Sequence, residues 1–172
     1  MHVLGICGSL QATSSNLLVL ATVAERLPSG TRFTRSDATA DLPAFNPDLD
    51  VDPPHPAVAR WRRQLAEADA VVISTPEYAH SYPGALKNGL DWVVGSGELV
   101  DKPVALITAG PSGGQRALDA LEPVLRVISS DLVGSLAIPA VRQKYDGARL
   151  VDAEVSGRLD DLLAELVAAV RP

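Results

Sequence analysis

Short apolar runs alternate along this chain with segments whose apolar residues recur at helical spacing. The clearest runs cover residues 2–7, 69–75 and 103–108, and weaker candidates lie at 31–36 and 135–138. Helices are expected at 17–27, 56–68, 117–128 and 155–170, with one more beginning at Pro83. Because the clear runs are continuously apolar, they suit a parallel sheet that is covered on both faces. The pattern predicts a doubly wound α/β fold of five strands and five helices.

Length and composition limit the class of protein. The 172 residues suffice for one domain, which we expect to span 1–172. The net charge is −6 and the basic residues are scattered apart from 60–64, so nucleic acid is not an expected partner. Cys7 is the single cysteine, which excludes an intramolecular disulfide and favours a reducing compartment. The apolar stretch at the N-terminus is too short for a signal peptide or a membrane span, so a cytoplasmic location without a membrane partner is expected.

Three loops have unusual compositions, and each directly follows an expected strand. They read GSLQATSSN after the first strand, PEYAHS after the third and TAGPSGG after the fourth. In open parallel sheets, ligands bind beyond the carboxyl ends of the strands, where the strand order reverses. The three loops are therefore expected to form one binding site.

The first loop ends in a cluster of polar side chains just before a helix. These are Ser9, Thr13, Ser14, Ser15 and Asn16. Unpaired N–H groups and the positive end of the helix dipole favour an anion there, typically a phosphate. The alternative is that Ser14 or Ser15 only caps the helix. Neither the P-loop spacing nor G-x-G-x-x-G is present, so an ATPase or a dinucleotide-binding Rossmann unit is not supported.

The other two loops offer different chemistry. Glu77, Tyr78 and His80 bring hydrogen-bonding groups and flat rings, although Tyr78 could instead pack against the neighbouring helix while His80 is solvated. In the fourth-strand loop, glycines at 110, 113 and 114 allow a ligand to approach the backbone closely, and Thr108 and Ser112 can hydrogen-bond to it. An ordinary glycine-rich turn into a helix is the alternative for that loop.

Two of these segments resemble the NAD(P)H-dependent FMN reductases, a flavodoxin-like family that includes quinone, chromate and azo-dye reductases. The resemblance covers nearly the whole chain. The family's first loop, G-S-x-R-x-x-S-x-N, is matched by Gly8, Ser9, Ser14 and Asn16. Its longer signature, P-E-Y-N-x-S-x-P-G-x-L-K-N-x-x-D-W, is matched by Pro76, Glu77, Tyr78, Ser81, Pro83, Gly84, Leu86, Lys87, Asn88, Asp91 and Trp92.

The resemblance implies a three-layer flavodoxin-like fold with strand order 2-1-3-4-5, an FMN cofactor and NAD(P)H as co-substrate. It implies that the first loop binds the FMN phosphate, that the PEY stretch meets the ribityl chain and the isoalloxazine edge, and that the fourth-strand loop approaches the ring from the other side. The cofactor-binding residues expected on this basis are Ser9, Gln11, Ser14, Ser15, Asn16, Pro76, Glu77, Tyr78, Ala79, His80, Thr108, Gly110, Ser112 and Gly113. No catalytic residue and no metal site is expected, because the cofactor carries the chemistry.

Two positions depart from the family pattern. Gln11 stands where the family usually has Arg, so a charge-assisted contact to the phosphate would be replaced by a neutral one. Ala79 stands where the family usually has Asn, which removes a side-chain amide from the rim of the flavin and leaves His80 as a possible substitute. Weaker FMN binding and an altered redox potential or substrate preference are the expected consequences.

The resulting hypothesis is an oxidoreductase that passes hydride from a nicotinamide to FMN and then electrons to a small acceptor: a flavin, a quinone, an azo compound or a metal oxyanion. One alternative is a non-enzymatic, flavodoxin-like electron carrier. Another is a small hydrolase that combines a serine with His80 and an aspartate, although no G-x-S-x-G motif is present.

Family members are usually dimers or tetramers, so a homodimer or homotetramer is expected, with residues 92–94 as candidate apolar contact surface. The long Pro- and Asp-rich loop at 37–56 is predicted to be a lid or partner surface. Pro123 is predicted to kink the fourth helix or delay its start.

Overall fold

The computed structural model describes residues 1–128 and 130–170. Its principal elements are β1 (His2–Cys7), α1 (Ser15–Arg26), β2 (Arg32–Arg35), α2 (Pro56–Ala66), β3 (Ala70–Thr75), α3 (Gly84–Asp91), β4 (Pro103–Gly110), α4 (Gln115–Val127), β5 (Asp131–Pro139), β6 (Tyr145–Asp146), β7 (Arg149–Leu150) and α5 (Ala153–Ala169). Short 3-10 helices occupy Ala38–Ala40, Pro47–Leu49 and Val141–Lys144. The alternation of strands and helices agrees with the pattern of apolar runs.

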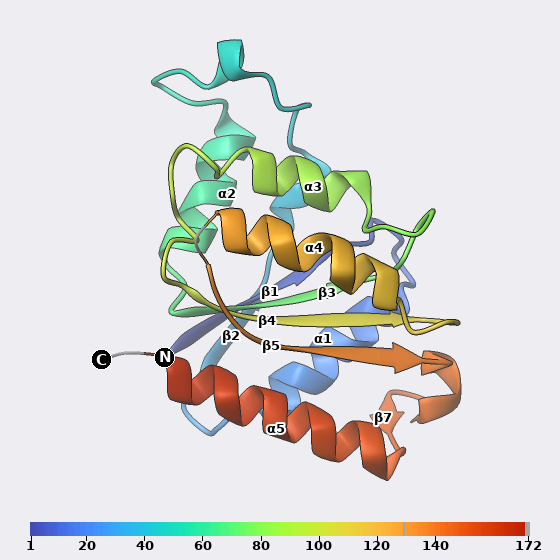
Figure 1. Ribbon diagram of the computed structural model, residues 1–172. Coiled ribbons are helices and arrows are strands. Elements are labelled where there is room, and N and C mark those ends of the chain that lie inside the picture. The colour runs from blue at the N-terminus through green and yellow to red at the C-terminus, as the bar shows by residue number, and fades with distance from the viewer. Residues whose placement is uncertain (129, 171–172) are drawn as a thin grey trace.

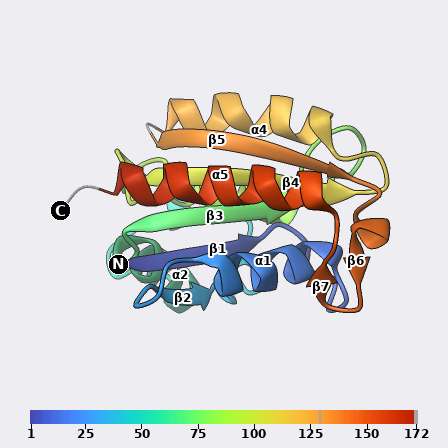
Figure 2. The same cartoon turned by 90° about the horizontal axis from the view of Figure 1, so that it is seen from below.

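The five long strands form one parallel sheet in the order β2-β1-β3-β4-β5. Helices α2, α3 and α4 cover one face, and α1 and α5 cover the other (Figures 1 and 2). Each face has its own buried cluster: Trp61, Leu86 and Leu121 belong to the first, whereas Val19 and Leu159 belong to the second. The three-layer, doubly wound fold and its strand order are thus confirmed.

The fifth strand of the parallel sheet is longer than its sequence indicates. β5 begins at Asp131, four residues before the expected start, and pairs with β4 along its length. Asp131 is exposed and Gly134 has no side chain, so this half of the edge strand lacks an apolar signal. A Cβ on Gly134 would lie 2.9 Å from the Leu162 side chain, so α5 packs closely against the strand there.

Pro123 does not delay the fourth helix. α4 begins at Gln115 and continues through Pro123 to Val127, so the predicted later start is wrong. Proline removes one backbone donor, but apolar residues on both sides of it still bury their side chains: Ala117, Leu118, Leu121 and Leu125. Packing of this amphipathic face outweighs the lost hydrogen bond.

The last residues of the longer motif shared with the FMN reductases, around 88–92, have a structural role. Trp92 and Val93 are only 1% exposed, so the expectation that they form a contact surface is wrong, and Val94 alone of the three is exposed. Asn88 and Trp92 both donate side-chain hydrogen bonds to the Pro43 carbonyl, and Asn88 also accepts one from the Phe45 N–H. These contacts hold the first part of the 37–56 loop against α3.

Candidate functional site

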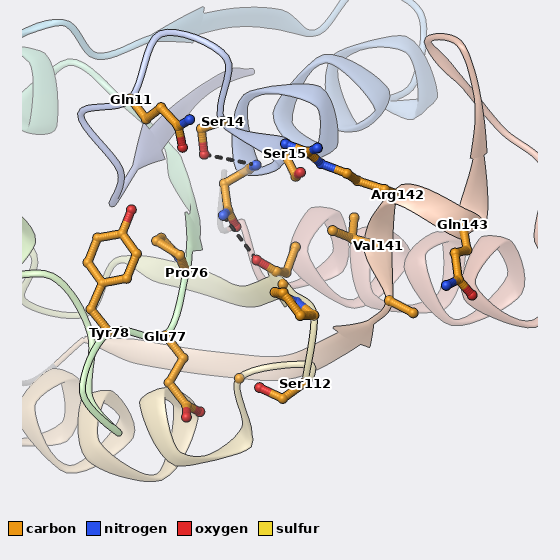
Figure 3. A pocket seen from close by; sticks show the side chains of 16 residues that line it. Gln11, Ser14, Ser15, Pro76, Glu77, Tyr78, Ser112, Val141, Arg142 and Gln143 are labelled. Atoms are coloured by element: carbon orange, nitrogen blue, oxygen red, sulfur yellow. Dashed lines mark hydrogen bonds between the residues drawn. The ribbon is translucent and has the colours of Figure 1, made fainter.

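A cavity of about 490 Å³ lies at the carboxyl ends of the strands, inside the range typical of small-molecule sites (Figure 3). It is lined by Gln11, Ser14, Ser15, Asn16, Pro76, Glu77, Tyr78, Ala109, Gly110, Pro111, Ser112, Gly114, Ala140, Val141, Arg142 and Gln143. The three loops that were expected to meet therefore do meet. Five of the expected residues lie outside the lining: Ser9, Ala79, His80, Thr108 and Gly113.

Close packing against β3 determines the path of the first loop. Gly8 donates its N–H to the Ser74 carbonyl at 2.8 Å, and a Cβ at Gly8 would lie 2.1 Å from Thr75 Oγ1. Only glycine fits this contact. The chain then turns toward α1, where Ser14 is the N-cap and its Oγ accepts from the Asn16 N–H. The capping alternative for Ser14 is therefore correct, and it coexists with the place of Ser14 in the cavity wall.

Asn16 joins three parts of the fold. It is 2% exposed; its Nδ2 donates to the Ala109 carbonyl at 3.1 Å and its Oδ1 accepts from Ser74 Oγ at 2.9 Å. The side chain thus connects α1 to β3 and β4 while forming part of the cavity wall. Buried polar groups need such partners, so this side chain has a structural task whether or not a ligand is bound.

The PEY segment forms a two-residue turn. Tyr78 and Ser81 exchange backbone hydrogen bonds of 2.8 and 3.0 Å, and the residues between them, Ala79 and His80, have φ values of 50° and 64°. Positive φ at both central positions is the requirement of type I′ turns, which favour Asn or Gly. Tyr78 remains 51% exposed with its hydroxyl 3.4 Å from Ser9 Oγ, so the alternative that it packs against the neighbouring helix is wrong.

His80 lies beside two charged side chains, Glu77 and Arg116. It is exposed, its Nδ1 lies 3.4 Å from Glu77 Oε1, and Arg116 Nη1 lies 2.8 Å from its Nε2. A Ser–His pair would need the imidazole within hydrogen-bonding reach of a serine. The contacts of His80 give the hydrolase alternative no support.

The fourth-strand loop is shaped by two residues just beneath the cavity surface. Thr108 is fully buried and its Oγ1 donates to the Gly113 carbonyl at 2.7 Å, which closes the loop on itself. Gly113 and Gly114 both have positive φ, a backbone conformation that most other residues avoid. Thr108 and Gly113 therefore support the loop, while Gly110 and Ser112 reach the cavity.

A fourth loop, not singled out in the sequence, completes the wall. Ala140, Val141, Arg142 and Gln143 follow β5 and line the cavity, and the Ala140 N–H donates to the Pro111 carbonyl at 3.1 Å. The end of the preceding strand was predicted to within one residue, but residues 140–143 carry no glycine-rich, serine-rich or PEY-like pattern that would mark a binding loop. In a parallel sheet every strand ends at the same edge, so a loop after the fifth strand was also a candidate.

Cys7 lies at the end of β1 next to these loops. Its burial raises the pKa of the thiol, and this effect outweighs the hydrogen bonds from Ser9 and Ser14, which act to lower the pKa. The neutral thiol is the favoured form at neutral pH, so Cys7 is not an activated nucleophile. Within residues 1–128 and 130–170 no cluster of three or more His, Cys, Asp or Glu side chains could hold a metal ion.

An open parallel sheet of order 2-1-3-4-5 with a cavity at its switch point defines a flavodoxin-like, nucleotide-binding α/β protein. The family model "NADPH-dependent FMN reductase" matches residues 1–143. The chain is 34% identical to a probable NADPH:quinone oxidoreductase 1 of Oryza sativa subsp. japonica, covering 98% of this chain and 91% of that protein. It is 30% identical to a quinone reductase of Escherichia coli K12, covering 98% and 93%.

Among solved structures, the chain is similar to FerB, a flavoenzyme NAD(P)H:(acceptor) oxidoreductase of Paracoccus denitrificans. The TM-score is 0.83 at 27% identity, and the match covers 98% of this chain and 96% of that one. The chain belongs to the NADPH-dependent FMN reductase family. Its function is that of an oxidoreductase with FMN as cofactor and NAD(P)H as reductant, and nothing found supports a non-enzymatic electron carrier.

The cavity itself suits a phosphorylated flavin. Hydroxyls of Ser14 and Ser15 lie at the N-terminus of α1, where the first N–H groups have no acceptor within the helix. Apolar side chains of Pro76, Pro111 and Val141 provide surface for a flat ring. An anionic group at one end and an aromatic ring at the other match this distribution of donors and apolar surface.

Proposed function

We propose that the protein is an NAD(P)H-dependent reductase of quinones or of similar small, flat acceptors, including free flavins and azo compounds. The observation that carries the proposal is the cavity at the switch point of a chain in the FMN reductase family. The named relatives include quinone reductases, which supports a quinone as the first acceptor to test. Metal oxyanions remain a further acceptor class within the same proposal.

We assign the cofactor contacts by position in the cavity. Ser14, Ser15 and Gln11 are assigned to the phosphate end, since they lie where α1 begins. Pro76 to Tyr78 and the loop at 110–112 are assigned to opposite edges of the flavin ring. We assign Asn16 a structural role in the cavity wall, because its side-chain amide is already hydrogen-bonded to Ala109 and Ser74.

Bound FMN would supply the redox chemistry by accepting a hydride from NAD(P)H and delivering electrons to the acceptor. The task of the chain is to hold the flavin and leave one face open. Tyr78, at 51% exposed, stands at the open side, where its ring offers a surface for a flat substrate. No nucleophile is needed, which fits the neutral, buried thiol of Cys7.

Absorbance and steady-state kinetics test the proposal. The purified protein reconstituted with FMN should show flavin bands shifted from those of free FMN, and should oxidise NADH or NADPH faster when 1,4-benzoquinone is added. Double-reciprocal plots should be parallel, because nicotinamide and quinone would use the same open face in turn. If the protein binds FMN but does not oxidise NAD(P)H, it is an electron carrier and not a reductase. If it binds no flavin, the proposal is contradicted.

We further propose that residues 1–172 act as one domain within a homodimer or homotetramer in the cytoplasm, where NAD(P)H is available. Support comes from the single sheet shared by both cores and from the lone, unpaired Cys7. No helix within the described parts of the chain is long and apolar enough to cross a membrane. Sedimentation equilibrium at several protein concentrations tests the oligomer, and a monomer throughout would contradict it.

A further inference from the structure

Arg142 occupies a defined place in the cavity wall. It follows Ala140, whose φ of 49° turns the chain sharply after β5 and whose N–H is held by the Pro111 carbonyl. Three residues beyond Arg142 the chain enters β6 at Tyr145, whose hydroxyl lies 3.0 Å from Thr22 Oγ1 of α1. The loop is thus held to the β4 loop on one side and to α1 on the other. In Figure 3 the Arg142 side chain extends toward Ser15.

The guanidinium charge of Arg142 is not paired within the described residues. The structure gives its guanidinium no ion pair and no hydrogen bond among residues 1–128 and 130–170. Only two charged side chains line the cavity in that part of the chain, Arg142 and Glu77. Glu77 stands on the PEY loop beside His80, away from Ser15 in Figure 3. The cavity therefore has its positive charge at the end where α1 begins.

The opposite situation holds at Gln11, the position where the family usually has Arg. Gln11 lines the same cavity, but its side chain is neutral and its Nε2 lies 3.4 Å from Thr13 Oγ1. A phosphate monoester carries a charge of about −1.5 to −2 at pH 7, and charge-assisted hydrogen bonds to it are stronger than neutral ones. Helix N–H groups and hydroxyls supply only neutral hydrogen bonds to that charge, so a nearby cation would add a stronger contact.

We propose that Arg142, from the loop after β5, is the cation that binds the FMN phosphate in this protein and replaces the missing charge at position 11. The inference rests on the proposed function and specifies its phosphate subsite. It assigns to the β5 loop a role in selecting FMN over flavins that lack a phosphate. A planar guanidinium suits this role because it can donate two parallel hydrogen bonds to phosphate oxygens.

The test compares FMN with riboflavin, which has the same ring and no phosphate. Apoprotein is titrated with each flavin, and quenching of flavin fluorescence reports binding without any turnover. In Arg142→Gln, FMN binding should weaken about tenfold at low ionic strength, while riboflavin binding should change less than about twofold. Arg142→Lys should retain part of the preference, and added salt should reduce the difference between wild type and Arg142→Gln.

Arg149→Gln is the matched control. Arg149 is also an exposed arginine in the segment after β5, but it does not line the cavity. Its removal should leave the ratio of the two affinities unchanged. If Arg142→Gln keeps the wild-type ratio, or weakens FMN and riboflavin equally, the inference is overturned. If wild type binds neither flavin, the proposed function fails first, so the two failures are distinguishable.

A second pair of variants tests whether an arginine at position 11 can take over the role of Arg142. Gln11→Arg added to Arg142→Gln should restore FMN binding to within about threefold of wild type. Gln11→Arg alone should have a smaller effect, because the phosphate charge is already compensated. Equal gains from Gln11→Arg in both backgrounds would contradict a shared phosphate site.

Discussion

At the scale of single residues, the same side chain often has a different task from the one its position in a motif indicates. Ala79 was expected to matter because it lacks an amide at the flavin rim. The structure instead places it at φ 50° in a two-residue turn and outside the cavity wall. Asparagine tolerates this backbone region better than alanine, since its side chain can bond locally. The departure at position 79 therefore bears on the turn itself.

Replacing Ala79 with Asn should stabilise the protein. The variant should raise the free energy of unfolding by about 1 kcal/mol, because it relieves part of the cost of a left-handed backbone. Urea unfolding followed by circular dichroism measures the change. Ala85→Asn is the control: Ala85 is the second residue of α3, where Asn relieves no left-handed backbone and is the poorer helix former, so that variant should lose up to about 0.7 kcal/mol. A destabilised Ala79→Asn would argue against strain at this turn.

At the scale of elements, the site depends on contacts that join helix starts to strand ends. Asn16 connects α1 to β3 and β4, and Gly8 lets the first loop lie directly on Thr75. Thr108 and Gly113 close the fourth-strand loop in a similar way. These residues position the cavity wall, and several of them do not face the cavity.

Asn16→Ala should cost stability even without ligand. It would leave the buried Ser74 hydroxyl and the Ala109 carbonyl without these partners, a loss of about 2–4 kcal/mol in the free energy of unfolding. Chemical denaturation of the apoprotein measures it. Ser15→Ala, one residue earlier on the same helix, should stay within about 0.5 kcal/mol of wild type. Comparable stabilities of the two variants would show that the Asn16 contacts contribute little.

Gly8→Ala should disturb the junction between β1 and β3. The added Cβ would meet Thr75 Oγ1 at 2.1 Å, and overpacking of this kind costs about 1–3 kcal/mol. At Gly84 the same substitution meets no atom within 4 Å, and it should stabilise α3 by about 0.4–1 kcal/mol. Thermal unfolding of both variants gives the comparison. A Gly8→Ala variant as stable as wild type would mean that the first loop moves freely away from β3.

At the scale of the whole molecule, the sheet brings four loops from distant parts of the chain to one edge. Folding and ligand binding are therefore linked, since a flavin that contacts several loops binds only when all of them are in place. Both cores share this sheet, so a ligand at its edge stabilises both layers of helices. Such linkage appears as a ligand-dependent midpoint of thermal unfolding.

FMN should raise that midpoint. At a free FMN concentration of 100 times Kd, mass action contributes about 2.7 kcal/mol. For a chain of this size that corresponds to roughly 5–11 °C in Tm. Differential scanning calorimetry at several FMN concentrations checks the shift, and riboflavin at the same concentration should give a smaller one. An FMN-independent Tm would contradict binding at the cavity.

The sequence alone determined the class of fold, the order of elements and three of the four loops of the site. Apolar runs and helical spacing are local consequences of burial, so they can be read from neighbouring residues. The start of β5 could not be predicted in this way, because an exposed Asp131 and a bare Gly134 carry no apolar signal. The loop that presents Arg142 was missed because residues 140–143 lack the serine-rich, glycine-rich or PEY-like pattern of the other three loops.

Only the tertiary structure decided which side chains face the cavity and which support it. Asn16 and Ala109 are 93 residues apart, and Trp92 meets Pro43 across 49, so no local pattern reports their hydrogen bonds. Residues of one motif therefore have different roles: Pro76 to Tyr78 line the cavity, whereas Asn88 and Trp92 hold the 37–56 loop through the Pro43 carbonyl. Whether a polar side chain binds a ligand depends on whether the protein has already satisfied its hydrogen bonds, and that is settled by contacts distant in sequence.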